Sequence, residues 1–147
     1  KKGGLSPDEE RDQLRMLIHI TGDLHQPFHV GKPGDRGGND VKVSFFNKET
    51  NIHAIWDSDL IEGKKMSYTE IATELQKRIN PVLIQKYTNT VPADWLKEAA
   101  AMRPDMYDIP ENGRIGYEYI YKNYHHVEER LTAAGIRLAQ ALEEIYG

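Results

Sequence analysis

The stretch HITGDLHQPFHVG, residues 19–31, constrains the fold of this chain more than any other. His19 and Asp23 are four residues apart, so a helix places both side chains on one face, one turn from each other. Pro27 cannot continue that helix, because proline has no N–H and restricts the residue before it. His29 follows this break and can fold back over the helix end. The stretch therefore predicts a helix that ends in a cluster of nitrogen and oxygen donors.

The same spacing occurs a second time, in NIHAIWD, where His53 precedes Asp57 by four residues. A single His-x3-Asp pair on a helix is most often a surface ion pair or a capping contact. Two such pairs together with His29 supply five nitrogen and oxygen donors, which suit zinc or a similar borderline ion. The chain has no cysteine, so disulfides and thiolate zinc sites are excluded.

The other histidines are weaker candidates. By its spacing, His25 points away from the face that carries His19. We expect it to hydrogen-bond to a ligand residue or to face solvent, and direct binding of the metal is a third alternative. His125 and His126 lie in a sequence rich in Tyr and Glu and are expected to be ordinary surface or half-buried residues. Trp56 is expected to pack in the core.

Composition limits the classes of protein that fit. With 147 residues, 39% of them hydrophobic, the chain is long enough for one domain with a core. No apolar run approaches the roughly 20 residues of a membrane span, so we expect no membrane partner. The net charge of −4 disfavours a protein that coats nucleic acid by neutralising phosphates. It does not exclude an enzyme that cleaves phosphates with the help of a bound metal.

The periodicity and the capping signals predict a mainly α chain with at most a small hairpin. Ser6, Pro7 and Glu9 form a helix start with a capping box, and this helix should run to about Leu24. Similar signals predict a glycine-rich loop over 31–40, a strand over 41–46 and a turn over 47–50. They then predict helices over 51–61, 68–86 and from 92 to about 103, a loop over 104–113, and a last helix over 115–146. Whether that last helix is interrupted near His125 or Gly135 stays open.

Three motifs together, HITGDLHQPFH, DRGGN and NIHAIWD, resemble the S1/P1 nuclease family of zinc-dependent enzymes. The resemblance is close over residues 14–61 and looser through VEERLTAAGIRLAQALEEIY in the last helix. It implies a phospholipase C/P1 nuclease-like helical fold with a small β-hairpin and with three zinc ions in a cleft.

The resemblance also implies a role for each matching residue. His19 would bind the first zinc, and Asp23, the catalytic candidate, would bridge the first and third. The ligands of the second zinc would be His29, His53 and Asp57. Asn39, in the Gly-Gly-Asn of the family pattern, would lie near the bound nucleotide, although these residues could also form a simple turn.

The activity implied by the resemblance is cleavage of phosphodiester bonds in single-stranded DNA and RNA to 5′-nucleotides, with removal of 3′-phosphates from nucleotides. The physical basis is a close metal pair, which can lower the pKa of bound water towards about 7. Attraction of the phosphate by zinc would also explain an acidic nuclease.

The remaining family ligands all precede the position of His19, where this chain begins with KKGG and has no histidine. We therefore expect residues 1–147 to be a single domain, the C-terminal part of a longer S1/P1 nuclease-like domain, with an N-terminal segment that carries the other zinc ligands. A degenerate relative is the alternative. Export, either secreted or periplasmic, is expected by analogy with the family.

Two rival functions remain. A zinc-dependent phospholipase C resembles these nucleases in fold, but its last ligand pair typically ends in glutamate, whereas Asp57 and the Gly-Gly-Asn motif favour the nuclease. A non-catalytic helical domain that binds one zinc is the second rival.

Overall fold

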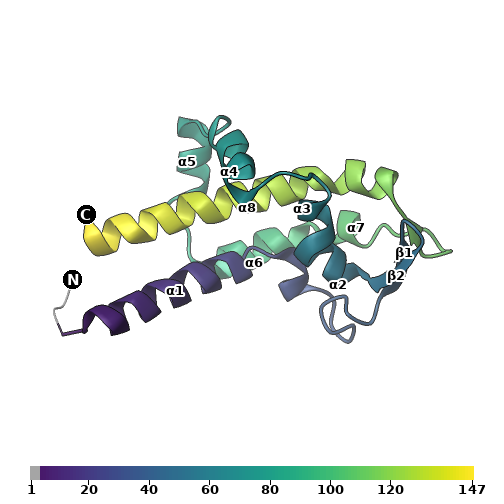
Figure 1. Ribbon diagram of the computed structural model, residues 1–147, viewed down its shortest axis with the longest axis horizontal. Coiled ribbons are helices and arrows are strands. Elements are labelled where there is room, and N and C mark those ends of the chain that lie inside the picture. Colours follow the sequence, from purple (N-terminus) through teal and green to yellow (C-terminus); the bar gives the residue numbers. More distant parts are fainter. Residues whose placement is uncertain (1–3) are drawn as a thin grey trace.

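The computed structural model describes residues 4–147 and is mainly helical (Figure 1). The helical elements are α1 (Pro7–Asp23), the 3-10 helix η1 (Pro27–Val30), α2 (Ile52–Ala54), the π-helix η2 (Ile55–Asp59), α3 (Leu60–Glu62), α4 (Tyr68–Gln76), α5 (Pro81–Tyr87), α6 (Pro92–Ala101), α7 (Arg103–Met106) and α8 (Tyr117–Tyr146). The strands are β1 (Lys42–Phe45), β2 (Lys48–Asn51) and β3 (Arg114–Ile115). The expected mainly α class with a small β element is confirmed.

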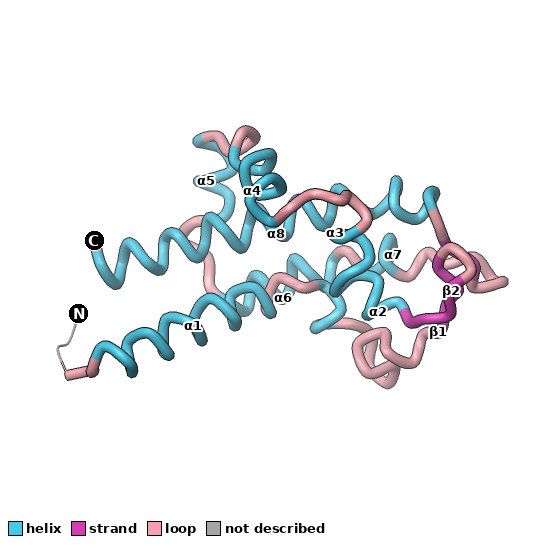
Figure 2. Tube along the Cα trace, viewed as in Figure 1, coloured by secondary structure: helices cyan, strands magenta, loops and turns pink. Residues whose placement is uncertain are grey.

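The two long helices, α1 and α8, contact each other along the long axis of the molecule (Figure 1). The strands are confined to the opposite end from the C-terminus, as Figure 2 shows by colour. None of the described helices combines the length and the apolar character that crossing a bilayer requires.

The predicted start of α1 is confirmed. The Ser6 hydroxyl accepts from the backbone N–H of Glu9 at 3.4 Å, and the Glu9 carboxylate accepts from the N–H of Ser6 at 2.8 Å. The helix ends at Asp23 with Leu24 as its C-cap, and Pro27 then begins η1. The sequence therefore determines both ends of the helix that carries the first donor pair.

The predicted helix over 68–86 is wrong, because the structure has two helices there. The capping box of Ser67 and Glu70 starts α4 as expected, but α4 ends at Gln76. Pro81 then opens α5, and the Asn80 side chain accepts from the N–H groups of Val82 and Leu83. A proline with an Asn N-cap before it starts a new helix and cannot continue an old one.

Two further boundaries differ from the prediction. Residues 104–113 were expected to be a loop, but α7 extends from Arg103 to Met106, with Pro104 in its first turn, where proline is tolerated. The last helix, α8, runs without a break from Tyr117 to Tyr146, so neither His125 nor Gly135 interrupts it.

The sheet has the order β2-β1-β3. β1 and β2 form the predicted hairpin, in which Phe45 pairs with Lys48, and its two turn residues, Phe46 and Asn47, both have positive φ. The turn expected over 47–50 is too long, since β2 already begins at Lys48. β3 pairs with β1 in parallel and was not predicted, because two residues are too few to show a strand pattern.

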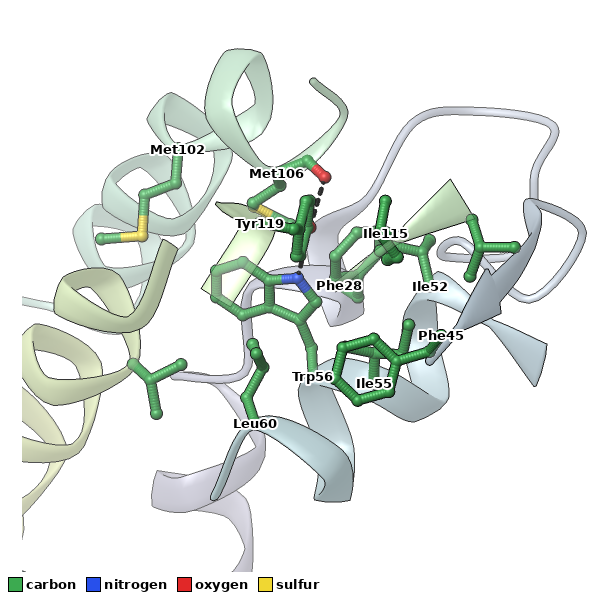
Figure 3. Packing of buried hydrophobic residues seen from close by; sticks show 12 residues of the cluster. Phe28, Phe45, Ile52, Ile55, Trp56, Leu60, Met102, Met106, Ile115 and Tyr119 are labelled. Carbon is green, nitrogen blue, oxygen red and sulfur yellow. Dashed lines mark hydrogen bonds between the residues drawn. The ribbon is translucent and has the colours of Figure 1, made fainter. Parts of the chain in front are cut away.

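The main core contains residues of η1, α2 and η2, the segments that carry His29, His53 and Asp57 (Figure 3). Phe28, Ile52 and Ile55 are fully buried next to His29, His53 and Trp56 in the sequence. Trp56 is buried as predicted, and its indole N–H donates to the hydroxyl of Tyr119 at 2.9 Å. This packing fixes the backbone positions of His29, His53 and Asp57.

Candidate metal centre

His29 is positioned by the turn that follows α1. Gln26 is the N-cap of η1, and its side chain accepts a hydrogen bond from the backbone N–H of Phe28. Phe28 packs in the core, so the next residue, His29, faces outward. Pro27 thus allows a sharp change of direction that brings His29 back beside the end of α1.

His53 and Asp57 lie in the connected elements α2 and η2. The Asn51 side chain caps α2 by accepting from the N–H of Ala54 at 2.9 Å. Asp57 lies in the π-helix η2, where the single regular helix predicted over 51–61 does not continue. π-helical turns are rare and frequently occur at functional sites. Despite this irregularity, Nε2 of His53 lies 3.1 Å from Oδ2 of Asp57.

These three side chains form one group in which a donor atom from each lies within 4.8 Å of the others. Nε2 of His29 is 4.0 Å from Oδ1 of Asp57, and the two imidazole rings stack with centroids 5.4 Å apart. The side chains of His29, His53 and Asp57 are 29%, 18% and 42% exposed, so the group opens to solvent.

Two backbone carbonyls set the tautomers of the histidines. Nδ1 of His53 lies 2.7 Å from the carbonyl oxygen of Gly37, and Nδ1 of His29 lies 3.0 Å from that of Asp23. Because a carbonyl only accepts, both Nδ1 atoms carry the hydrogen, and in the neutral rings Nε2 presents a lone pair. Both Nε2 lone pairs then face a carboxylate. A cation stabilises such an arrangement, and two imidazoles with one carboxylate suit zinc.

The loop over 31–40 supplies one of these carbonyls and requires glycine to do so. Gly37 has φ +64°, and a Cβ there would lie 2.6 Å from the carbonyl oxygen of Phe28. Asp35 anchors the loop, since its carboxylate accepts from the N–H of Gly38 at 3.0 Å and from the hydroxyl of Tyr107 at 2.6 Å. Burial and the bond to Asp35 raise the pKa of Tyr107 to about 12, so the phenol remains a donor.

Asn39 lies in the same loop and is half-buried. Its side-chain amide donates to the backbone carbonyl of Arg36 at 3.0 Å, within the loop. A contact between Asn39 and a nucleotide stays a prediction.

The other predicted pair is not part of this group, although Asp23 adjoins it. His19 is exposed on α1, and the Asp23 side chain is half exposed, with its Oδ1 3.0 Å from Nδ1 of His29. The structure therefore brings together three of the five predicted ligands, His29, His53 and Asp57, and leaves His19 and Asp23 on the surface beside them. Zinc binding by any of the five stays a prediction.

The exposure expected for His25 is wrong, because its side chain is buried. Its Nδ1 lies 2.7 Å from the carbonyl of Thr21, and its Nε2 accepts from Nη1 of Arg137 at 2.8 Å. Burial, with the charges of Arg130 and Arg137, lowers its pKa to about 4. The signal was present in the sequence, since His25 follows Leu14, Leu17 and Thr21 on one helix face. His125 is exposed as expected, but the surface or half-buried position expected for His126 is wrong, because it is buried with Nε2 2.9 Å from Oδ2 of Asp105. Neither histidine joins the metal group.

A charged cluster that the sequence does not predict lies behind the site, formed by Glu98 on α6 and by Arg130 and Arg137 on α8. The Glu98 carboxylate accepts from Nη1 of Arg130 and Nη2 of Arg137, both at 2.7 Å, and both arginines are buried. Arg130 also donates from Nε to the carbonyl of His25 at 3.2 Å. Although burial opposes it, the hydrogen bonds from the two arginines lower the pKa of Glu98. This cluster holds the turn between Asp23 and His29.

Comparison with known proteins identifies relatives of the whole chain. The family model described as S1/P1 Nuclease matches residues 1–147. Endonuclease 3 of Arabidopsis thaliana is 33% identical over 159 residues, which cover 92% of this chain and 51% of that protein. Endonuclease 4 of the same plant is 32% identical over 155 residues, with 92% and 50% covered. Nuclease S1 of Aspergillus oryzae is 36% identical over 61 residues, or 42% of this chain and 21% of that protein. The chain thus spans about half the length of the plant relatives that it matches.

Proposed function

The chain belongs to the S1/P1 nuclease family, and from this premise we propose that it forms part of a zinc-dependent phosphodiesterase. Its substrates are single-stranded DNA and RNA, which it cleaves to 5′-nucleotides, and it also removes 3′-phosphates from nucleotides. The names of its relatives, endonucleases and nucleases, support this activity class. The observation that carries the proposal is the convergence of His29, His53 and Asp57, with both Nδ1 atoms held by carbonyls.

In this proposal His29, His53 and Asp57 hold one zinc ion. His19 and Asp23 would take part in holding two further ions, with Asp23 as a shared ligand. Zinc at these positions supplies Lewis acidity, which activates water at neutral pH and stabilises negative charge on a phosphate oxygen.

The protein's own groups prepare the site for this chemistry. The carbonyls of Gly37 and Asp23 hold the Nδ1 hydrogens, so that Nε2 of each histidine stays available as a donor. The Asp57 carboxylate supplies negative charge next to both rings. Asn39, whose loop adjoins His53 through Gly37, contributes an amide to the nucleotide.

The donors that complete the sites of His19 and Asp23 are proposed to come from polypeptide outside residues 1–147. Two features of α1 support this arrangement. His19 is exposed and lies outside the three-donor group, and Met16 and Ile20, four residues apart on the side of α1 that carries His19 and Asp23, are 54% and 46% exposed. Exposed apolar side chains that gather beside a polar group mark interaction surfaces. We propose that this face of α1 contacts the completing segment, and that the protein is exported, either secreted or periplasmic.

Zinc content and nuclease activity, measured together, test the proposal. Elemental analysis of the 147-residue chain should find about one zinc, at the group His29, His53 and Asp57, and no turnover. The complete protein should contain about three zinc ions and should release 5′-nucleotides from single-stranded DNA until a chelator is added. Hydrolysis of phosphatidylcholine without nuclease activity would instead indicate the phospholipase. Full zinc content without any phosphoester cleavage would indicate the non-catalytic domain.

A further inference from the structure

The side chain of Gln26 connects the two segments that carry the metal group. Its Oε1 accepts from the backbone N–H of Phe28, which makes Gln26 the N-cap of η1. Its Nε2 donates to Oδ1 of Asp57 at 2.6 Å, across 31 positions of the sequence. One amide therefore caps the turn that presents His29 and also holds the carboxylate that faces His53.

The orientation of this amide follows from its partners. The N–H of Phe28 can only donate, so it requires the oxygen of Gln26, and the Asp57 carboxylate can only accept, so it requires the nitrogen. In the flipped orientation both contacts would be repulsive. The cap thus fixes which end of the amide meets Asp57.

The contact has a consequence for the carboxylate. The Asp57 side chain is 42% exposed, so polar contacts more than burial hold its carboxylate in place. Gln26 binds Oδ1, while Oδ2 lies 3.1 Å from Nε2 of His53. With Oδ1 committed to the amide, Oδ2 is presented to the donor nitrogen of His53.

We propose that Gln26 is a positioning residue, which fixes Asp57 as a ligand through one oxygen and ties that ligand to the turn of His29. This inference rests on the proposed zinc site of His29, His53 and Asp57. A neutral hydrogen-bond donor suits position 26. A carboxylate there would repel Asp57, and a hydrocarbon side chain would leave Oδ1 of Asp57 without its hydrogen bond. Hydrogen-bond partners behind metal ligands typically contribute tenfold to a hundredfold in metal affinity.

The variant Gln26→Asn separates the two roles of the side chain. Asparagine is a good N-cap, but its side chain is shorter by one carbon–carbon bond, roughly 1.5 Å, and does not reach Asp57. Gln26→Leu removes the cap and the carboxylate contact together. The matched control is Gln85→Asn, the same substitution at an exposed position of α5.

Three measurements on the 147-residue chain distinguish positioning from general stability. Zinc affinity is measured by competition with a coloured chelator, ligand geometry by the visible absorption of bound cobalt(II), and stability by thermal unfolding of the metal-free protein. We expect Gln26→Asn to lower zinc affinity by about tenfold or more and to shift the cobalt absorption, with little change in the unfolding temperature. Gln26→Leu should show the same losses and should unfold about 2–4 °C lower. Gln85→Asn should match the wild type in all three measurements.

The outcomes also separate this inference from the proposed function. Unchanged zinc affinity and an unchanged cobalt spectrum in Gln26→Asn would overturn the positioning role and leave the nuclease proposal intact. Failure of the wild-type chain to bind zinc or cobalt would overturn both. The expected losses in Gln26→Asn would support the positioning role even if the complete protein cleaved no nucleic acid.

Discussion

The two His-x3-Asp pairs have the same spacing, but they lie in different surroundings. The pair His53 and Asp57 stands above the buried residues Ile52 and Ile55 and meets His29 from another segment. The pair His19 and Asp23 lies on the open face of α1, where Asp23 contacts His29 but His19 lies outside the group. Spacing along a helix places two donors on one face. The third donor, His29, comes from a second segment, η1, whose backbone is fixed by packing of Phe28 in the core.

Replacement of one histidine from each pair gives the largest expected difference. His53→Ala should lower the zinc affinity of the 147-residue chain by more than about a hundredfold, since loss of a ligand exceeds the loss of a residue behind one. His19→Ala should leave it unchanged, because His19 lies outside the three-donor group. Chelator competition measures both. Equal losses in the two variants would show that the pairs bind one ion together.

A variant of the charged cluster behind the turn between Asp23 and His29 tests how much that cluster stabilises the fold. Glu98→Gln leaves the buried guanidinium groups of Arg130 and Arg137 without their carboxylate. We expect the free energy of unfolding to fall by about 2–3 kcal/mol, less than for a fully buried pair because the Glu98 side chain is 31% exposed. Urea unfolding measures this loss. Glu74→Gln, which removes the exposed partner of Lys77, is the control and should resemble the wild type.

The glycine that orients His53 allows a narrower test. Gly37→Ala adds a Cβ 2.6 Å from the Phe28 carbonyl, at a residue with φ +64°, and should destabilise the protein by about 2–3 kcal/mol. Gly34→Ala is the matched control, because Gly34 has φ +88° but nothing within 4 Å of an added Cβ. It should lose only about 1 kcal/mol through backbone strain. Zinc affinity should fall in Gly37→Ala alone. Equal effects in both variants would show that the carbonyl of Gly37 does not contribute to zinc binding.

Local signals in the sequence were sufficient for the parts of the site that depend on neighbouring residues. The capping box of Ser6 and Glu9 and the break at Pro27 fixed the helix that ends beside His29. Spacing alone gave five candidate donors, and the grouping of His29 with His53 and Asp57 came from the resemblance to the S1/P1 nuclease family. Pro81 carried an equally local signal that the predicted helix over 68–86 ignored.

Other parts depend on contacts that no window of sequence contains. The π-helix around Asp57 and the two-residue strand β3 are set by packing and by pairing with β1. The contacts of Arg130 with Glu98 and of Gln26 with Asp57 span 32 and 31 positions. Each of these groups is polar and has no periodic pattern, so the sequence alone gives no reason to pair them.

The smallest expected effect is the pH dependence of the Glu98 cluster. The pKa of Glu98 is lower in the folded protein than its ordinary value, because the hydrogen bonds from Arg137 and Arg130 outweigh burial. Its carboxylate therefore stabilises the fold above the unfolded pKa, and this stabilisation is lost as the pH falls through the folded pKa. We expect the difference in free energy of unfolding between the wild type and Glu98→Gln to shrink as the pH falls from about 5 to about 3. Urea unfolding across this range measures the difference, and other carboxylates cancel because both proteins contain them.

A constant difference would mean that Glu98 stabilises the turn by its shape and not by its charge. The frame behind His29 would then be independent of pH, and any acid sensitivity of zinc binding would belong to the ligands themselves.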